Sequence, residues 1–204
     1  EQYGVKNAFR RLIKKILRLL SWEQETFFLY GKKISSDDSY ADLPSEFEAR
    51  EIFDVEPLKK SPFDFNHDKL ALFKKRFLTD GFHCYGAFKS GILVYYCWIS
   101  TREFDFPSGT YKRELSVNEG LLFDAQCHSS ARGAGVHGAM NGYRCQQLVE
   151  KGKDKALVVL LKENIPAIRS QIRIGFELFE QINIFRLFGK TKVTVKNVSD
   201  QVSQ

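Results

Sequence analysis

Apolar residues along this chain recur with two periods, one typical of amphipathic helices and one typical of strands. The helical pattern occurs in four segments, residues 5–21, 67–80, 134–151 and 164–174. Runs rich in aromatic and β-branched residues predict strands at residues 25–34, 46–55, 82–88, 92–101, 119–127, 156–161, 176–188 and 190–195. The polar stretches between these elements are expected to be loops, among them residues 35–45, 59–66 and 102–116.

The order of these elements predicts an α/β domain of the α+β type with a mixed sheet. Residues 82–88, 92–101 and 119–127 are expected to form an antiparallel meander, because Lys89-Ser90-Gly91 is a tight turn between the first two strands. The last of these strands, the helix after it and the strand at 156–161 predict a right-handed parallel crossover. Since the strand at 156–161 is uniformly apolar, we place it at the centre of the sheet.

The pattern divides the chain into residues 1–22, a basic amphipathic helix, residues 23–196, the main domain, and residues 197–204, a polar tail expected to fray. Apolar side chains in the first part fall on one helical face, at Phe9, Ile13, Ile16, Leu17 and Leu20. Three interpretations stay open for residues 5–21: packing on the main domain, contact with another subunit, or peripheral contact with an anionic membrane. The protein is accordingly expected to be a monomer or a homodimer.

Composition and charge restrict the class of protein. With 204 residues, 43% hydrophobic and 27% charged, the sequence is typical of one folded domain. The formal net charge is +6, and the first 20 residues hold five of these excess charges. Because the basic segment has no interleaved aromatic residue beyond Phe9, we expect no nucleic-acid partner.

Cysteine spacing and apolar run lengths set the expected environment. None of the four cysteines, Cys84, Cys97, Cys127 and Cys145, belongs to a Cys-x-x-Cys pair, so we predict reduced thiols and no metal site. No apolar run is long enough to span a bilayer, and basic residues interrupt the N-terminal apolar positions, which argues against a signal peptide. These features predict a cytoplasmic protein.

The stretch with the clearest chemistry is the turn Ala131-Arg132-Gly133-Ala134-Gly135, which lies between the strand at 119–127 and the next helix. A glycine-rich turn that opens into a helix points backbone N–H groups at an anion, and the helix N-terminus adds positive charge. Small residues at such a junction are also explained by close packing alone. The chain has no Gly-Lys-Ser/Thr motif, and its early meander argues against a dinucleotide-binding Rossmann fold.

Two spaced motifs resemble the GCN5-related N-acetyltransferase (GNAT) superfamily over about residues 82–176. The turn of that family reads Arg/Gln-x-x-Gly-x-Gly/Ala, which Arg132 and Gly135 match and His137 does not. The family's second motif, an Asn, an Ala three residues later and a closing Gly-Phe, matches Asn164, Ala167 and Gly175-Phe176. The resemblance implies a mostly antiparallel twisted sheet flanked by helices, with a parallel, splayed central strand pair.

The resemblance also implies that the main domain binds acetyl-CoA or another acyl-CoA as co-substrate, without a metal. Its pyrophosphate is expected on backbone N–H groups from Arg132 to Gly138, and its pantetheine arm beside the end of the strand at 119–127. A backbone N–H of Cys127 or His128 would polarise the thioester carbonyl. Asn164 would contact the pantetheine or, alternatively, cap its helix. The implied cofactor-binding residues are Gln126, Cys127, His128, Arg132, Gly133, Ala134, Gly135, Val136, His137, Gly138 and Asn164.

The implied reaction is direct attack of an amine on the thioester, which requires a neutral amine and therefore a general base. The candidates are Glu119, Asp124 and His128, of which we favour His128. Strand alternation predicts Asp124, Gln126 and His128 on one face, opposite Phe123, Ala125 and Cys127. The tyrosine that serves many family members as general acid is replaced by Gln171, which puts that role in doubt; Tyr143 and Tyr111 are alternatives.

Two further expectations concern His137 and the acceptor. His137 either adds positive charge to the phosphate site or faces solvent on the first helical turn. The acceptor, a small-molecule or peptide amine, is expected between residues 59–80 and 102–116, where charged and aromatic side chains alternate. The sequence thus predicts an acyl-CoA-dependent N-acyltransferase. The alternative is a non-catalytic GNAT-like module that binds coenzyme A or a partner protein.

Overall fold

The computed structural model describes residues 23–106 and 109–198. The expected N-terminal helix at 5–21 and the end of the expected tail lie outside these residues. The last strand of the described residues ends at Asn197, one residue into the expected tail. None of the helices in the described ranges has the length and apolar character needed to cross a membrane.

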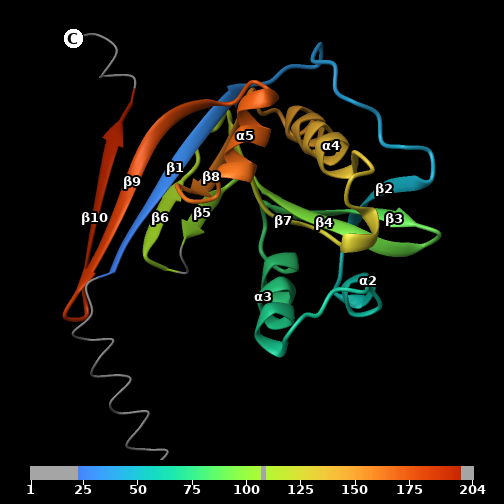
Figure 1. The fold of residues 1–204 in the computed structure, drawn as a ribbon, viewed down its shortest axis with the longest axis horizontal. Helices are drawn as coiled ribbons and strands as arrows, with labels where there is room; N and C mark the ends of the chain where they lie inside the picture. The colour runs from blue at the N-terminus through green and yellow to red at the C-terminus, as the bar shows by residue number, and fades with distance from the viewer. Residues whose placement is uncertain (1–22, 107–108, 199–204) are drawn as a thin grey trace, which may run out of the picture.

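The described residues form one twisted sheet of eight strands, in the order β10-β9-β1-β8-β7-β4-β3-β2 (Figure 1). Only β7 and β8 pair in parallel, and the other neighbours are antiparallel. The expected mixed, mostly antiparallel sheet with one parallel pair is therefore confirmed. The strands are β1 (Glu23–Lys33), β2 (Phe47–Ile52), β3 (Phe82–Lys89), β4 (Ile92–Ser100), β7 (Glu119–Cys127), β8 (Lys155–Leu161), β9 (Glu177–Leu187) and β10 (Lys190–Asn197).

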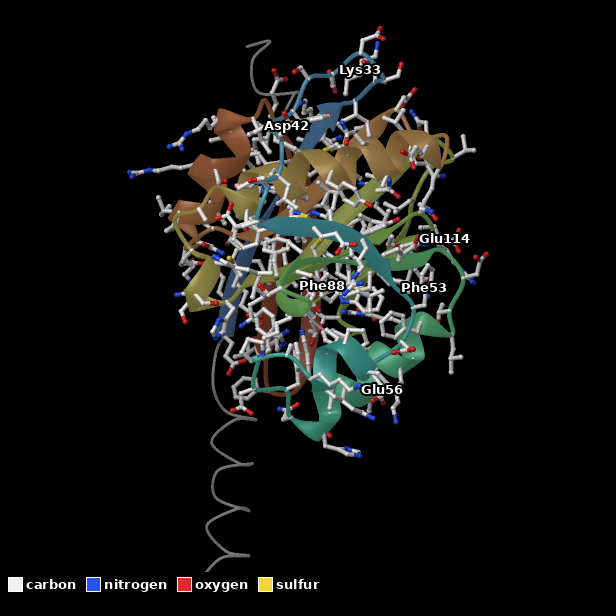
Figure 2. All side chains as sticks on the ribbon, turned by 90° about the vertical axis from the view of Figure 1, so that its right-hand side faces the viewer. Lys33, Asp42, Phe53, Glu56, Phe88 and Glu114 are labelled. Atoms are coloured by element: carbon white, nitrogen blue, oxygen red, sulfur yellow. The ribbon has the colours of Figure 1, made fainter. Side chains whose placement is uncertain are left out.

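Helices cover both faces of the sheet. Figure 2 shows α4 on one side of the sheet, with α2 and α3 on the other. Successive side chains of β4 point to opposite faces of the sheet and pack in both layers. Tyr95, Cys97 and Ile99 belong to the core cluster beneath α4. Tyr96 and Trp98 belong to the cluster beneath α3. The helices are α2 (Glu56–Lys59), α3 (His67–Phe77), the 3₁₀ turn η1 (Ser129–Ala131), α4 (Val136–Glu150) and α5 (Ile165–Arg173).

The stretch 102–116, expected to be a loop, is a separate hairpin of β5 (Glu103–Phe106) and β6 (Tyr111–Glu114). Phe104 and Phe106 stack on each other, and Phe106 packs against Phe27 of β1 with ring centroids 4.8 Å apart. This burial of aromatic side chains stabilises a short two-stranded hairpin that its polar composition does not indicate. The short helix α2 was also not expected.

The parallel pair is short and then diverges. β7 and β8 pair only from Glu119 with Lys155 to Leu122 with Val158. Beyond this point β7 stays with β4, and β8 stays with β1 as far as Leu161. The splayed central pair is thus confirmed, and within residues 23–106 and 109–198 no strand pairs with the freed edge of the second half of β7 (Figure 1).

Candidate functional site

A β-bulge interrupts β7 at the point where it leaves β8. The register with β4 runs from Trp98 opposite Phe123 to Tyr96 opposite Gln126, so Asp124 and Ala125 share one position on β4. Asp124 has a φ of 45°, an unusual value for a residue other than glycine. The bulge places Phe123 on the same face as Gln126, and the strict alternation expected for Phe123 is therefore wrong.

Asp124 is held by two cations of α3. Lys69 Nζ lies 2.8 Å from both carboxylate oxygens, and Arg76 Nη1 lies 2.6 Å from Oδ2. These charge-assisted bonds stabilise the ionised carboxylate and occupy both of its oxygens, so Asp124 does not suit the expected role of general base. Lys69 and Arg76 were not singled out from the sequence. Both lie on the same face of α3 as the buried Phe73, so each cation needs a negatively charged partner there.

Glu119 lies at the opposite end of β7 from the splay, eight residues before Cys127, or about 26 Å along an extended strand. It is buried and accepts hydrogen bonds from Arg113 (2.8 Å) and Lys155 (3.0 Å). Burial alone would raise its pKa, but the hydrogen bonds from Lys155 and Arg113 outweigh burial and lower it. The expectation that Glu119 is a general base is wrong on position and on partners.

His128 directly follows β7 and is half-buried against Phe63, with ring centroids 5.7 Å apart. Its Nδ1 lies 2.8 Å from the Ser130 hydroxyl. No hydrogen bond to Nε2 exists among the residues that the structure describes. Of the three base candidates, His128 is the one with a proton-accepting atom, Nε2, that forms no hydrogen bond to the described residues.

The backbone at the end of β7 distinguishes the two expected oxyanion donors. The N–H of His128 donates to the Val94 carbonyl (2.9 Å), and is therefore committed to β4. Tyr95 lies opposite Cys127 in this ladder. Because successive N–H groups of a strand point to opposite sides, the N–H of Cys127 points away from β4, into the gap left by β8.

The glycine-rich turn forms an open cradle of backbone N–H groups at residues 133–138, which we call the anion cradle after the role expected of it. Gly133 and Gly135 have φ values of 81° and 79°, a conformation that side-chain-bearing residues rarely adopt. In the described residues, no acceptor binds the six backbone N–H groups of the cradle, and no side chain caps α4. A cavity of about 160 Å³ lies over them, between Cys127 and Gly138.

The cradle coincides with the expected phosphate site except at Arg132. The N–H of Arg132 donates to the Ser129 carbonyl (3.3 Å), so this residue contributes its exposed side chain instead of its backbone. The Arg132 Nε donates to the Cys127 carbonyl (3.3 Å), which ties the turn to the end of β7. A Cβ on Gly138 would meet no atom within 4 Å, which leaves room for a ligand above the first turn of α4.

Both expectations for His137 are wrong. Its ring is half-buried, with Nδ1 3.1 Å from the Tyr95 hydroxyl and Nε2 3.3 Å from the Asn141 amide nitrogen. Burial, together with the nearby charge of Arg144, lowers its pKa to about 4. His137 is therefore neutral at pH 7, and it faces the sheet instead of solvent.

The second motif lies on α5, beyond the splayed end of β8. Asn164 caps the helix, because its Oδ1 accepts from the Ala167 N–H (3.4 Å). Gln171 is buried, and its Oε1 has no hydrogen-bond partner in the described part of the chain. An amide has no proton of suitable pKa to give to a thiolate, so Gln171 does not replace the tyrosine.

A second cavity, of about 340 Å³, lies on the α3 face of the same strand end. Residues 64–66 and Lys69, from one of the two segments expected to border the acceptor, line this cavity, whereas the β5–β6 hairpin does not. Three consecutive β7 residues, Asp124 to Gln126, form one wall. The full lining is Asp64, Phe65, Asn66, Lys69, Tyr96, Asp124, Ala125 and Gln126. Across residues 23–106 and 109–198, no three His, Cys, Asp or Glu side chains are grouped to hold a metal.

No protein-family model matches this chain, and no curated protein sequence matches it either. Solved structures do match. A Drosophila protein has a TM-score of 0.62 at 17% identity, over 89% of this chain and 58% of its own. A tandem GNAT protein from the clavulanic acid biosynthesis pathway has a TM-score of 0.57 at 14% identity, over 84% of this chain and 54% of its own. A complex of AAC(6')-Iy with a coenzyme A bisubstrate analogue has a TM-score of 0.50 at 18% identity, over 65% and 92%.

The expected fold, a mostly antiparallel sheet with one parallel pair and flanking helices, is thus shared with solved GNAT structures. The chain spans only about 58% and 54% of the lengths of the Drosophila and tandem GNAT proteins.

Proposed function

We propose that the chain is an acyl-CoA-dependent N-acyltransferase, with acetyl as the expected acyl group. One observation carries the proposal: the anion cradle and the second cavity lie on opposite faces of β7, and both reach its unpaired end at residues 124–127. A polyanionic coenzyme on one face and an amine on the other would meet at this strand end. That convergence suits transfer between two substrates better than binding of one.

The residues of the cradle fit coenzyme A. Six unbound N–H groups, the N-terminus of the 15-residue helix α4 and the Arg132 side chain suit a pyrophosphate. The amide groups of a pantetheine arm can extend the sheet along the unpaired edge of β7, where the Cys127 N–H points into the gap. When bound, the coenzyme supplies the acyl group as an activated thioester.

His128 is proposed as the general base that keeps the attacking amine neutral, since its Nε2 is open and its ring lies beside the strand end. Neither Asp124 nor Glu119 is proposed for this role. With Gln171 in place of a tyrosine, the thiolate leaves without a general acid, which its ordinary pKa near 8.5 tolerates.

The second cavity is proposed to hold the amine acceptor. Its carboxylates, Asp64 and Asp124, are balanced by Lys69 and the adjoining Arg76, so the cavity has no excess negative charge. A polycation would gain little attraction there, whereas Phe65 and Tyr96 offer apolar contact. We therefore propose a monoamine with an apolar body as acceptor.

Calorimetry with acetyl-CoA and desulfo-coenzyme A tests the proposal. We expect Arg132→Glu to weaken binding at least about tenfold, because it reverses a charge at the phosphate site. Lys192→Glu, which makes the same charge change on the exposed strand β10, is the matched control and should bind like the wild type. No binding of either ligand by the wild type would contradict the proposed function.

A second function, a non-catalytic module that binds coenzyme A, is favoured by the buried Gln171 at the position of the general acid. A panel of mono- and polyamines incubated with acetyl-CoA separates the two functions. Release of free thiol that depends on an amine supports the transferase. Tight coenzyme binding without amine-dependent thiol release supports the module.

A further inference from the structure

A buried arginine lies further along α4 from the anion cradle, with no opposite charge beside it among the described residues. Arg144 of α4 is only 2% exposed, and no carboxylate in the described ranges forms an ion pair with it. One Nη group donates to the Asn141 side-chain oxygen, and Nε has no partner among the described residues. Arginine keeps its charge when buried, so this arrangement destabilises the fold unless something compensates it.

The neighbouring groups do not supply a negative charge. Burial raises the pKa of the Cys145 thiol and the pKa of the Tyr95 hydroxyl, and burial raises the pKa of Cys97 to about 11. All three are neutral at pH 7. The charge of Arg144 is therefore uncompensated inside the described part of the fold.

A chain of hydrogen bonds leads from Arg144 toward the cradle. Because a guanidinium only donates, it fixes the Asn141 oxygen toward itself and the Asn141 amide N–H₂ toward His137 Nε2. Nε2 must then accept, and Nδ1–H donates to the Tyr95 hydroxyl. Every donor in this chain points away from Arg144, so the aligned dipoles carry its positive potential along α4 as far as His137 and Tyr95.

This chain of hydrogen bonds ends on the Tyr95 hydroxyl and passes through His137, beside the cavity over the cradle. His137 lines that cavity, and its N–H is one of the six open N–H groups. The side chains at 137, 141 and 144 follow one another along one face of α4, spaced about 5–6 Å apart. Arg144 thus lies roughly 10 Å along the helix from His137.

We propose that Arg144 is a built-in counter-charge for the phosphate groups of the cradle ligand, acting through Asn141 and His137 as a positioning residue. The inference rests on the proposed function, since it takes the ligand to be coenzyme A. The arginine destabilises the empty protein and is compensated when phosphate is bound. The protein should therefore bind coenzyme A more tightly than pantetheine, the part of the coenzyme that lacks phosphate.

Three variants test this role. In Arg144→Met the charge is lost with similar volume, in Arg144→Lys it is kept, and in Asn141→Asp a carboxylate is placed beside it. We expect Arg144→Met to melt at the same or a higher temperature than the wild type without ligand. Its affinity for coenzyme A should fall about tenfold, while its affinity for pantetheine, which lacks phosphate, stays unchanged.

Asn141→Asp should weaken coenzyme A binding as Arg144→Met does, because the new carboxylate neutralises the guanidinium. Arg144→Lys should keep most of the affinity. Calorimetry and thermal melts read out all variants with both ligands. A lower melting temperature of Arg144→Met, with coenzyme A and pantetheine weakened equally, would overturn the inference and leave a structural arginine.

The failure of this inference is distinguishable from failure of the proposed function. If the wild type binds coenzyme A and Arg144→Met binds it equally well, only the counter-charge is refuted. If the wild type binds no coenzyme A, the proposed function fails, and the counter-charge fails with it.

Discussion

Asp124 and His128 lie four residues apart at the end of β7, yet their surroundings differ. Asp124 accepts from Lys69 and Arg76, while His128 has an open ring nitrogen. Residue type alone does not separate them, because the cations that fix Asp124 come from α3, some 50 residues earlier in the chain. At the scale of single residues, the number and charge of the groups that contact Asp124 and His128 therefore distinguish the roles proposed for them.

The half-buried ring of His137 predicts a pH-dependent stability. Its folded pKa of about 4 lies below the unfolded value near 6.5, so the unfolded chain binds a proton first as the pH falls. Stability is therefore lost as the pH falls from 6.5 toward 4, by up to about 3 kcal/mol. Urea unfolding of His137→Gln should show a flatter pH dependence in this window, whereas His67→Gln, an exposed control, should follow the wild type.

The variant Asp124→Asn tests whether Asp124 stabilises the β-bulge of β7 or acts as the general base. Asparagine tolerates the left-handed conformation of this position, so mainly the ion pairs are removed. We expect a loss of about 1–3 kcal/mol in the free energy of unfolding, since Lys69 and Arg76 lose a common partner. The kcat of transfer at pH 7 should stay close to the wild-type value, because His128 is retained. A fall in kcat of about a hundredfold or more would show that Asp124 is the base; Asp68→Asn, on the exposed side of α3, is the control.

At the scale of elements, the sequence predicted the glycine turn, α4 and the meander because local pattern determines them. The start of α3 is also set locally, since Asn66 Oδ1 accepts from the Lys69 N–H (2.8 Å) and caps the helix. The bulge at Asp124 was not predicted, because it depends on the pairing of β7 with β4. The inward position of His137 was not predicted either, because it depends on a contact with Tyr95, which is distant in the sequence.

Two glycines of the cradle should respond differently to alanine. Gly135, with a φ of 79°, is strained by a side chain, and Gly135→Ala should lower the free energy of unfolding by about 1–2 kcal/mol. Gly138 is helical with open space around its Cβ position, so Gly138→Ala should raise it by about 0.5–1 kcal/mol. Thermal melts of both variants check this. Equal effects would contradict the geometry described for the turn.

At the scale of the molecule, two half-sheets meet at a short junction. Figure 1 shows β10, β9, β1 and β8 on one side and β7, β4, β3 and β2 on the other. The position of β1 between β8 and β9 was not predicted, since a first strand carries no local signal of distant partners. The β5–β6 hairpin was missed for the same reason, because it is stabilised by Phe27 and by Arg113, whose Nη1 lies 3.0 Å from Glu180.

Glu119 joins the two half-sheets, and the last prediction concerns it. Its carboxylate binds Lys155 of β8 and Arg113 of β6, while Arg113 also binds Glu180 of β9. Glu119→Gln leaves two partly buried cations with weaker partners, so we expect a loss of about 2–4 kcal/mol at pH 7. Because hydrogen bonds keep its folded pKa below the unfolded value, this contribution is present above the unfolded pKa and is lost as the pH falls through the folded one.

Urea unfolding at pH 7 and below pH 4 should therefore show a large difference between Glu119→Gln and the wild type at pH 7, and a smaller one in acid. Glu114→Gln, on the exposed side of β6, is the control and should match the wild type at both pH values. The affinity for coenzyme A should stay unchanged, since Glu119 lies at the end of β7 opposite the cradle. An equal loss at both pH values would mean that packing, instead of charge, holds the half-sheets together.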